Sequence, residues 1–209
     1  MRREVELNAT SQVPSLLAFP ETREGPAVGT GLSPARAQWD RRPPRILVAG
    51  VGYTCLTDLS VGPALVERLQ AQEWPDGVLV EDLSYGPIDV LFKLQASPPF
   101  RAAVFVTAAS RGRAPGTLHR GTWTQASLPA DELQARMAEA ITGVISLDNL
   151  LHILNHFGTL PAEVVTFEVE PLAGTWGTEF SPPVRAALAE AESAVRREVE
   201  RILATEPAA

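Results

Sequence analysis

The fold is decided by the stretch Ile-Leu-Val-Ala-Gly at residues 46–50, a short apolar run that ends in glycine. A run of this length without polar alternation is typical of a strand buried on both faces of a parallel sheet. Similar runs recur further along the chain. The sequence therefore predicts four strands of one mainly parallel sheet, near residues 45–50, 78–83, 102–107 and 163–169.

Amphipathic segments separate these runs, and several of them begin at a proline, which is well tolerated in the first turn of a helix. The stretch from Gly116 to Gln125 alternates enough to be a strand near an edge, and Ser146 is a candidate helix cap. Strands that alternate with helices predict an α/β fold: a single three-layer domain with a twisted, mainly parallel sheet flanked by helices. Any site should lie beyond the carboxyl ends of the strands. Helices are expected at residues 62–73, from Pro87 onward, and at 130–142, 147–157 and 182–204.

Residues 1–44 differ from the rest of the chain because they contain six prolines and no sustained helical or strand period. This composition predicts a disordered, proline-rich extension. The segment Val-Pro-Ser-Leu-Leu-Ala-Phe at residues 13–19 is a candidate for a short docking piece, and a plain flexible tail is the alternative. The predicted α/β domain covers residues 45–204.

The composition is that of an ordinary soluble globular protein, with 209 residues, 45% of them hydrophobic and 21% charged. The net charge of −7 argues against nucleic acid or an anionic membrane as the main partner. No apolar run approaches the roughly 20 residues that span a bilayer. The single cysteine, Cys55, cannot form an internal disulfide, which favours a reducing compartment. We therefore expect a cytoplasmic protein.

Familiar catalytic motifs are missing. The glycines at 50 and 52 suggest a dinucleotide fingerprint, but Cys55 stands where its third glycine belongs, and the sequence has no phosphate-binding P-loop and no Gly-x-Ser-x-Gly elbow. His152 and His156 stand one helical turn apart, a spacing that can hold a metal, but Ile153 excludes the His-Glu-x-x-His motif. We interpret both as surface or half-buried histidines of an amphipathic helix, and Cys55 as a small buried hydrophobe. Capping or solvation explains most of the carboxylates at element ends, namely Asp58, Glu81, Asp82 and Asp148.

Several separated motifs, taken together and in order, resemble the hydrogenase maturation protease family. These endopeptidases clip the C-terminal extension from the large subunit of nickel–iron hydrogenases after nickel insertion. The resemblance covers about three quarters of the chain and implies a compact twisted sheet wrapped by helices. It is carried by residues 45–52, by 57–63 (where the family usually has Gly-Asp-[Asp/Glu]-Gly-x-Gly), by 104–109 and 114–118, and by Phe157-Gly158, Pro161, Glu170-Pro171 and 180–184.

The resemblance also implies a site, and this chain departs from it. Family members use a Glu or Asp, an Asp and a His that together hold a metal, the nickel of the substrate. Asp58 matches the first acid of the family's acidic pair, but the three ligand positions fall on Leu59, Thr107 and Gly143. Leucine and glycine side chains cannot ligate a metal, and a lone threonine hydroxyl is a poor ligand. We therefore treat Asp58, Leu59, Thr107 and Gly143 as vestigial positions, assign no catalytic residue and no metal site, and expect no cofactor.

The resemblance and the departures from it leave three possible functions. In the first, the chain is a non-catalytic homologue that binds or chaperones a hydrogenase large subunit or its C-terminal tail, or pairs with an active homologue. In the second, it is an active metal-dependent endopeptidase with a rebuilt site, which removes that C-terminal extension and uses the substrate's nickel. In the third, it is an unrelated binding module or small-molecule enzyme, since a fold alone does not fix chemistry.

Overall fold

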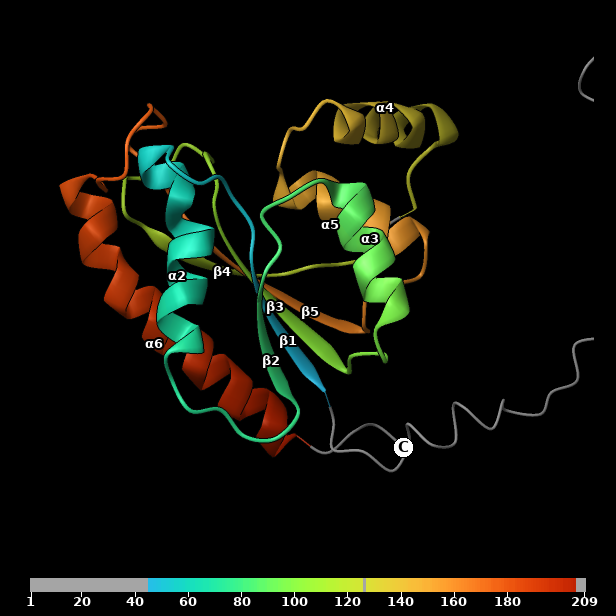
Figure 1. The fold of residues 1–209 in the computed structure, drawn as a ribbon, viewed down its shortest axis with the longest axis horizontal. Helices are drawn as coiled ribbons and strands as arrows, with labels where there is room; N and C mark the ends of the chain where they lie inside the picture. The colour runs from blue at the N-terminus through green and yellow to red at the C-terminus, as the bar shows by residue number, and fades with distance from the viewer. Residues whose placement is uncertain (1–44, 126, 206–209) are drawn as a thin grey trace, which may run out of the picture.

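A computed structural model describes residues 45–125 and 127–205 of the chain (Figure 1). The predicted disordered extension, with the docking segment at 13–19, lies outside the described residues. The described chain builds a five-stranded sheet with helices on both faces.

The sheet has the strand order β2-β1-β3-β5-β4. The first four of these strands are parallel, whereas β4 runs antiparallel to β5 at one edge. This confirms the four predicted strands in one mainly parallel sheet and the predicted edge strand. The bounds are β1 Ile46–Gly50, β2 Val78–Asp82, β3 Ala102–Ala108, β4 Leu118–Thr122 and β5 Glu163–Val169.

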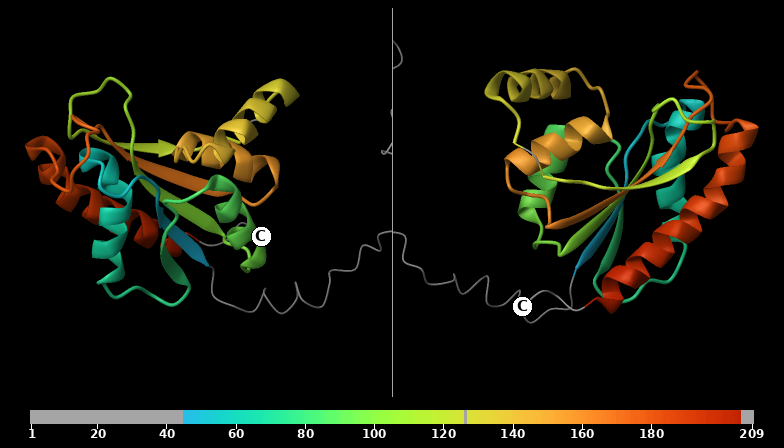
Figure 2. Two further views of the ribbon diagram at one scale, coloured as in Figure 1. Left: turned by 45° about the horizontal axis from the view of Figure 1, so that its top comes forward. Right: turned by 180° about the vertical axis from the view of Figure 1, so that it is seen from behind.

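Helices cover both faces of the sheet (Figures 1 and 2). On one face α2 and the long α6 pack against strand residues such as Val48 and Val104, and on the other α3 and α5 pack against Leu47 and Phe105. The side chains alternate between faces because successive strand residues point to opposite sides. The three predicted layers are confirmed. The helices are η1 Thr57–Ser60 (a 3-10 turn), α2 Val61–Gln70, α3 Pro87–Ala96, α4 Ala130–Ile141, α5 Leu147–His156 and α6 Pro182–Ala204.

Two glycines bring the backbone of β1 against the start of α2. A β-carbon on Gly50 would lie 2.3 Å from the carbonyl oxygen of Gly62, and one on Gly62 would lie 2.4 Å from the carbonyl oxygen of Val51. Neither distance is possible for a real side chain, so both positions require glycine. The glycine turn after β1 thus serves close packing of strand on helix, and it fixes where the loop of residues 51–60 emerges.

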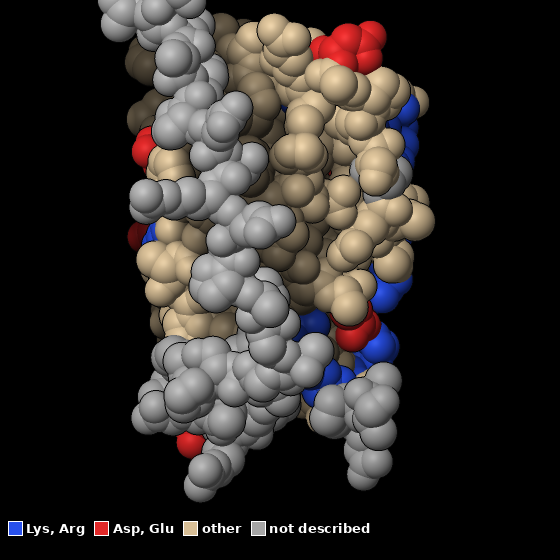
Figure 3. Space-filling view, turned by 90° about the vertical axis from the view of Figure 1, so that its right-hand side faces the viewer, with Lys and Arg blue, Asp and Glu red and all other residues tan. Residues whose placement is uncertain are grey.

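The side of the molecule formed by α3, α4 and α5 shows few charged side chains on its described surface (Figure 3). α3 and α4 expose the large apolar side chains of Phe92 and Ile141, which are 62% and 81% accessible. None of the described helices combines the length and apolar character needed to cross a membrane.

Candidate functional site

The site that the resemblance implies belongs at the edge of the sheet where β1 and β3 end and α5 begins. Tyr53, in the loop after β1, accepts a hydrogen bond on its hydroxyl oxygen from the backbone N–H of Ile145 at 2.9 Å. This bond ties the loop to the segment that enters α5. α5 itself starts at the predicted cap, where the Ser146 hydroxyl accepts from the N–H of Asn149. Between these elements lies a pocket of about 180 Å³, lined by residues 107–111 and 146–148.

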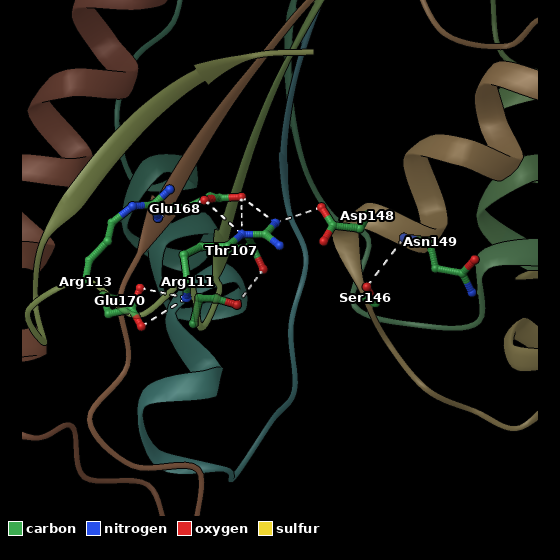
Figure 4. A network of polar contacts seen from close by, with 9 residues as sticks. Thr107, Arg111, Arg113, Ser146, Asp148, Asn149, Glu168 and Glu170 are labelled. Atoms are coloured by element: carbon green, nitrogen blue, oxygen red, sulfur yellow. Dashed lines mark hydrogen bonds and ion pairs between the residues drawn. The ribbon is translucent and has the colours of Figure 1, made fainter. Parts of the chain in front are cut away.

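An arginine stands in this pocket, held between two carboxylates (Figure 4). Arg111 Nη2 lies 2.8 Å from Asp148 Oδ1 on α5 and 2.7 Å from Glu168 Oε1 on β5. Arg113 approaches the second oxygen of Glu168 at 3.0 Å. The Glu168 side chain is only 10% accessible, so its charge depends on these two guanidinium groups. We refer to Arg111, Arg113, Asp148 and Glu168 as the Arg111 cluster.

The pKa values of the cluster show how tightly its charges are matched. The hydrogen bonds that Arg111 donates to Asp148 and then to Glu168 raise the pKa of Arg111. The bond from Arg111 lowers the pKa of Asp148, against the opposing effect of burial. Burial alone would raise the pKa of Glu168, but Arg111 and Arg113 together outweigh it and lower this pKa. The guanidinium of Arg111 and the carboxylates of Asp148 and Glu168 therefore remain charged at neutral pH.

Glu170, just after β5, sets the position of Arg111 through the backbone. Its carboxylate accepts bonds from the N–H of Arg111 at 2.9 and 3.0 Å and from the N–H of Gly112 at 3.1 Å. Burial would raise the pKa of Glu170, but these backbone donors outweigh it and lower the pKa. The sequence analysis missed Arg111 and Glu168 as partners. The available signal was Glu168 itself, a charge inside the apolar strand run, which needs a partner when buried.

The three positions that the resemblance assigns to metal ligands do not form one cluster of polar groups within the described chain. Thr107 lines the pocket beside Arg111, and its hydroxyl donates to the neighbouring carbonyl of Ala108 at 3.2 Å. Gly143 is exposed, has a φ of 83°, and has open space where a side chain would stand. Leu59 packs against Gly174, because a β-carbon added to Gly174 would lie 2.8 Å from Leu59 Cδ1.

Asp58 is fully buried and faces the segment of residues 172–181. Its carboxylate accepts four hydrogen bonds, from the N–H groups of Leu172 (2.9 Å), Ala173 (3.0 Å) and Ser181 (2.8 Å), and from the Ser181 hydroxyl (2.7 Å). Burial would raise the pKa of Asp58, but the bonds from Ser181, Ala173 and Leu172 outweigh it and lower the pKa. Four donors use the lone-pair positions of a carboxylate, so this group is already fully engaged within the fold.

His152 and His156 lie on α5 as half-buried and exposed side chains, as the sequence predicts. His152 is half-buried on α5, with its ring edge-on to Trp123 at 4.8 Å, and burial is the main cause that lowers its pKa. His156 on α5 and His119 on β4 are exposed. Among the residues that the structure describes, no three His, Cys, Asp or Glu side chains are grouped closely enough to hold a metal ion.

Cys55 corrects the sequence analysis. We expected a small buried hydrophobe, but the thiol is exposed. Its φ of 63° places it in the left-handed region, where the chain turns sharply out of β1 toward η1. The next residues are fixed by a bridge to the far segment, in which Thr57 N–H donates to the carbonyl of Gly177 and Gly177 N–H donates to that of Cys55, both at 2.9 Å. This loop therefore follows its bonds to residues 172–181 and leaves Cys55 outside the core.

If the Arg111 cluster stabilises this edge, replacing Arg111 by methionine should lower the free energy of unfolding by about 2 kcal/mol, because the buried Glu168 loses one of its two partners. Urea denaturation at pH 7 measures this change. Arg185→Met is the matched control, since Arg185 pairs with Glu179 in an exposed position and its loss should cost less than about 0.5 kcal/mol. Equal losses in the two variants would contradict a structural role for the cluster.

Comparisons with known proteins bear on the whole fold. No protein-family model matches the sequence, and neither does any curated protein. Solved structures do match. The hydrogenase maturating endopeptidase HybD from E. coli is 25% identical over 75% of this chain and 93% of its own, with a TM-score of 0.56. The chain has the fold of the hydrogenase maturation proteases. A hydrogenase 2 maturation peptidase from a Thaumarchaeota archaeon agrees, with 25% identity over 74% of this chain and 97% of its own and a TM-score of 0.54.

The family resemblance predicted from the motifs is thereby confirmed. An endopeptidase from E. coli, solved in solution, is 23% identical over 75% of this chain and 93% of its own, with a TM-score of 0.58, and adds support for the fold alone. Within the hydrogenase maturation protease fold, the chain carries the Arg111 cluster at the edge of the sheet where the resemblance implies a metal site.

Proposed function

We propose that this chain is a non-catalytic homologue of the hydrogenase maturation proteases, one that binds the large subunit of a nickel–iron hydrogenase during its maturation. One observation carries the proposal. Thr107, at the position of the family's strand-three aspartate, lies in a pocket with the ion-paired Arg111 instead of with other metal-binding side chains. The other two ligand positions, Leu59 and Gly143, offer no donor atom.

The charge of the pocket supports the loss of metal-dependent cleavage. An arginine stays protonated at any physiological pH, so the guanidinium of Arg111 repels a divalent cation from this place. The nearby carboxylates of Asp148 and Glu168 are paired with it. A nickel ion in the substrate would therefore be repelled by the fixed positive charge of Arg111, and the two carboxylates nearby would already be paired with that charge.

Retained binding is supported by the segment of residues 172–181, which Asp58 holds in place. This segment exposes Leu172 at 58% and Trp176 at 83%. Large apolar side chains exposed together often mark protein contacts, and tryptophan is enriched among residues that dominate binding energy. We propose that this segment contacts the large subunit or its C-terminal tail.

The test incubates the purified full-length chain with a nickel-loaded large-subunit precursor. We expect the precursor to remain uncut while it copurifies with the chain, and an active HybD should cut the same precursor in parallel. Trp176→Ala should weaken the association by about tenfold. Phe92→Ala, at an exposed position on α3, is the matched control and should leave the affinity unchanged.

The other outcomes separate the alternatives. Cleavage of the precursor would establish the active endopeptidase with a rebuilt site. A precursor that is neither cut nor bound would favour the third alternative, in which the chain is a binding module or small-molecule enzyme with an unrelated partner. An active homologue that copurifies in place of the precursor would show that the chain pairs with that enzyme.

A further inference from the structure

The outer edge of β4 has backbone groups that pair with no other described strand. Toward β5, Trp123 N–H donates to the carbonyl of Val164, and the carbonyl of Thr117 accepts from Glu170 N–H. Backbone groups alternate in direction along an antiparallel strand, so the odd-numbered residues of β4 face β5. The N–H and C=O groups of Leu118, Arg120 and Thr122 therefore face outward, and β4 is the last strand of the sheet. An edge of this kind can accept a further strand.

A groove of about 370 Å³ runs along this edge, between β4 and α6. Its floor is apolar and consists of Leu118, Phe167 and Ala194. Phe167 and Ala194 are largely buried, at 3% and 9% accessible, and belong to the hydrophobic core. The groove therefore runs along the boundary of that core. A strand added to β4 would place alternate side chains over this floor.

The rim of the groove is basic, although the whole chain carries a net charge of −7. Arg120, Arg197 and Arg201 line it together with the acid Glu198, and Arg201 also pairs with Glu163 at the start of β5. Glu198 is buried beneath two of them, with Arg120 Nη2 at 2.8 Å and Arg201 Nε at 2.7 Å from its Oε1. Arg197 is exposed and pairs with no residue of the described chain. The side chain that enters this groove should therefore be acidic.

A second copy of the chain fits this edge poorly, because β4 against β4 would bring two sets of arginines together. The chain's own first residues fit better. Residues 4–7 read Glu-Val-Glu-Leu, so an extended backbone places Glu4 and Glu6 on one face and Val5 and Leu7 on the other. We propose that this segment adds to the outer edge of β4 as a sixth strand, with Glu4 and Glu6 facing the arginine rim. Their methylene groups cover the apolar floor while the carboxylates reach the guanidinium groups.

The chain between this segment and β1 is long enough to allow the pairing. β1 and β4 are separated by β3 and β5, which is a lateral distance of about 14 Å at the usual strand spacing. Residues 8–44 connect the segment to the start of β1, and each residue can span up to about 3.3 Å. The connection is therefore several times longer than the distance from β1 to β4.

Hydrogen exchange of the full-length chain, followed residue by residue by NMR, tests the proposal. We expect the amides of Leu118, Arg120 and Thr122 to be protected. The double variant Glu4→Lys with Glu6→Lys should accelerate their exchange by about tenfold, because two attractive charge contacts with the arginine rim become repulsive. The amides of His119 and Gly121 should not change, since they are bonded to β5. The matched control is Glu21→Lys with Glu24→Lys, which changes the charge equally outside the segment and should leave all five amides unaffected.

A charge exchange adds a second line of evidence. Arg197→Glu alone should also accelerate exchange at Leu118, Arg120 and Thr122, and combining it with Glu4→Lys and Glu6→Lys should restore part of the protection. Equal exchange in the full-length chain and in the first double variant would overturn the proposal. Protection that disappears on dilution would instead assign the edge to a second copy, and protection that requires an added protein would assign it to another partner.

Discussion

Replacing Asp58 by alanine is expected to lower the free energy of unfolding by about 3 kcal/mol or more, measured by urea denaturation at pH 7. The side chain is completely buried and accepts four hydrogen bonds from residues 172–181. Its removal leaves the N–H groups of Leu172, Ala173 and Ser181 without their acceptor. The control is Asp148→Ala, because Asp148 is partly exposed and its pairing with Arg111 should contribute about 1 kcal/mol or less.

The stabilisation by Asp58 should depend on pH in a defined direction. Its pKa is lowered in the folded protein, so its contribution is fully present above the unfolded value near 3.8 and is lost as the pH falls through the folded pKa. The difference between the native chain and Asp58→Asn should therefore be constant from pH 7 to about 5 and shrink below about pH 4. A difference that stays constant down to pH 2, or that grows on acidification, would contradict the proposed role of the carboxylate.

The layers of the fold were predictable because the signals are local. The apolar run at residues 46–50 has no polar alternation, and its burial on both faces is what such a run indicates. Ser146 caps α5 as expected, since its hydroxyl and the N–H of Asn149 that it accepts from lie only three residues apart. Even the antiparallel edge strand β4 was visible as an alternating segment. Each of these features depends on residues that are neighbours in the sequence.

The candidate site was predictable only in part because its contacts join distant segments. Arg111 and Glu168 are 57 positions apart, and Asp58 bonds to residues 114 to 123 positions away. Nothing near Arg111 in the sequence shows that it faces a carboxylate. The exposure of Cys55 was missed for the same reason, since the bridge to Gly177 determines how its loop turns. Motif alignment located the edge of the sheet, but the partners there come from tertiary structure.

Those partners determine how a metal site would have to be restored. Leu59→Glu, Thr107→Asp and Gly143→His introduce the three ligands that the family resemblance implies, but Arg111 would remain beside the new carboxylate at position 107 and pair with it. We therefore expect the triple variant to gain less than tenfold in nickel affinity. Adding Arg111→Ser should raise the gain to about a hundredfold or more, because the ligands then lose their internal cation. Calorimetric titration of each variant with nickel chloride measures the two gains.

The backbone sets a limit on this gain. At Gly143 the φ of 83° costs a histidine roughly 1–2 kcal/mol, although no atom would obstruct its side chain. Leu59→Glu also removes the packing against Gly174. Both losses apply equally to the triple and quadruple variants, so the ratio of their nickel affinities isolates the effect of Arg111. Equal affinities in the two variants would show that the guanidinium is not the obstacle, and the proposed loss of metal-dependent cleavage would then have to follow from Leu59, Thr107 and Gly143 alone.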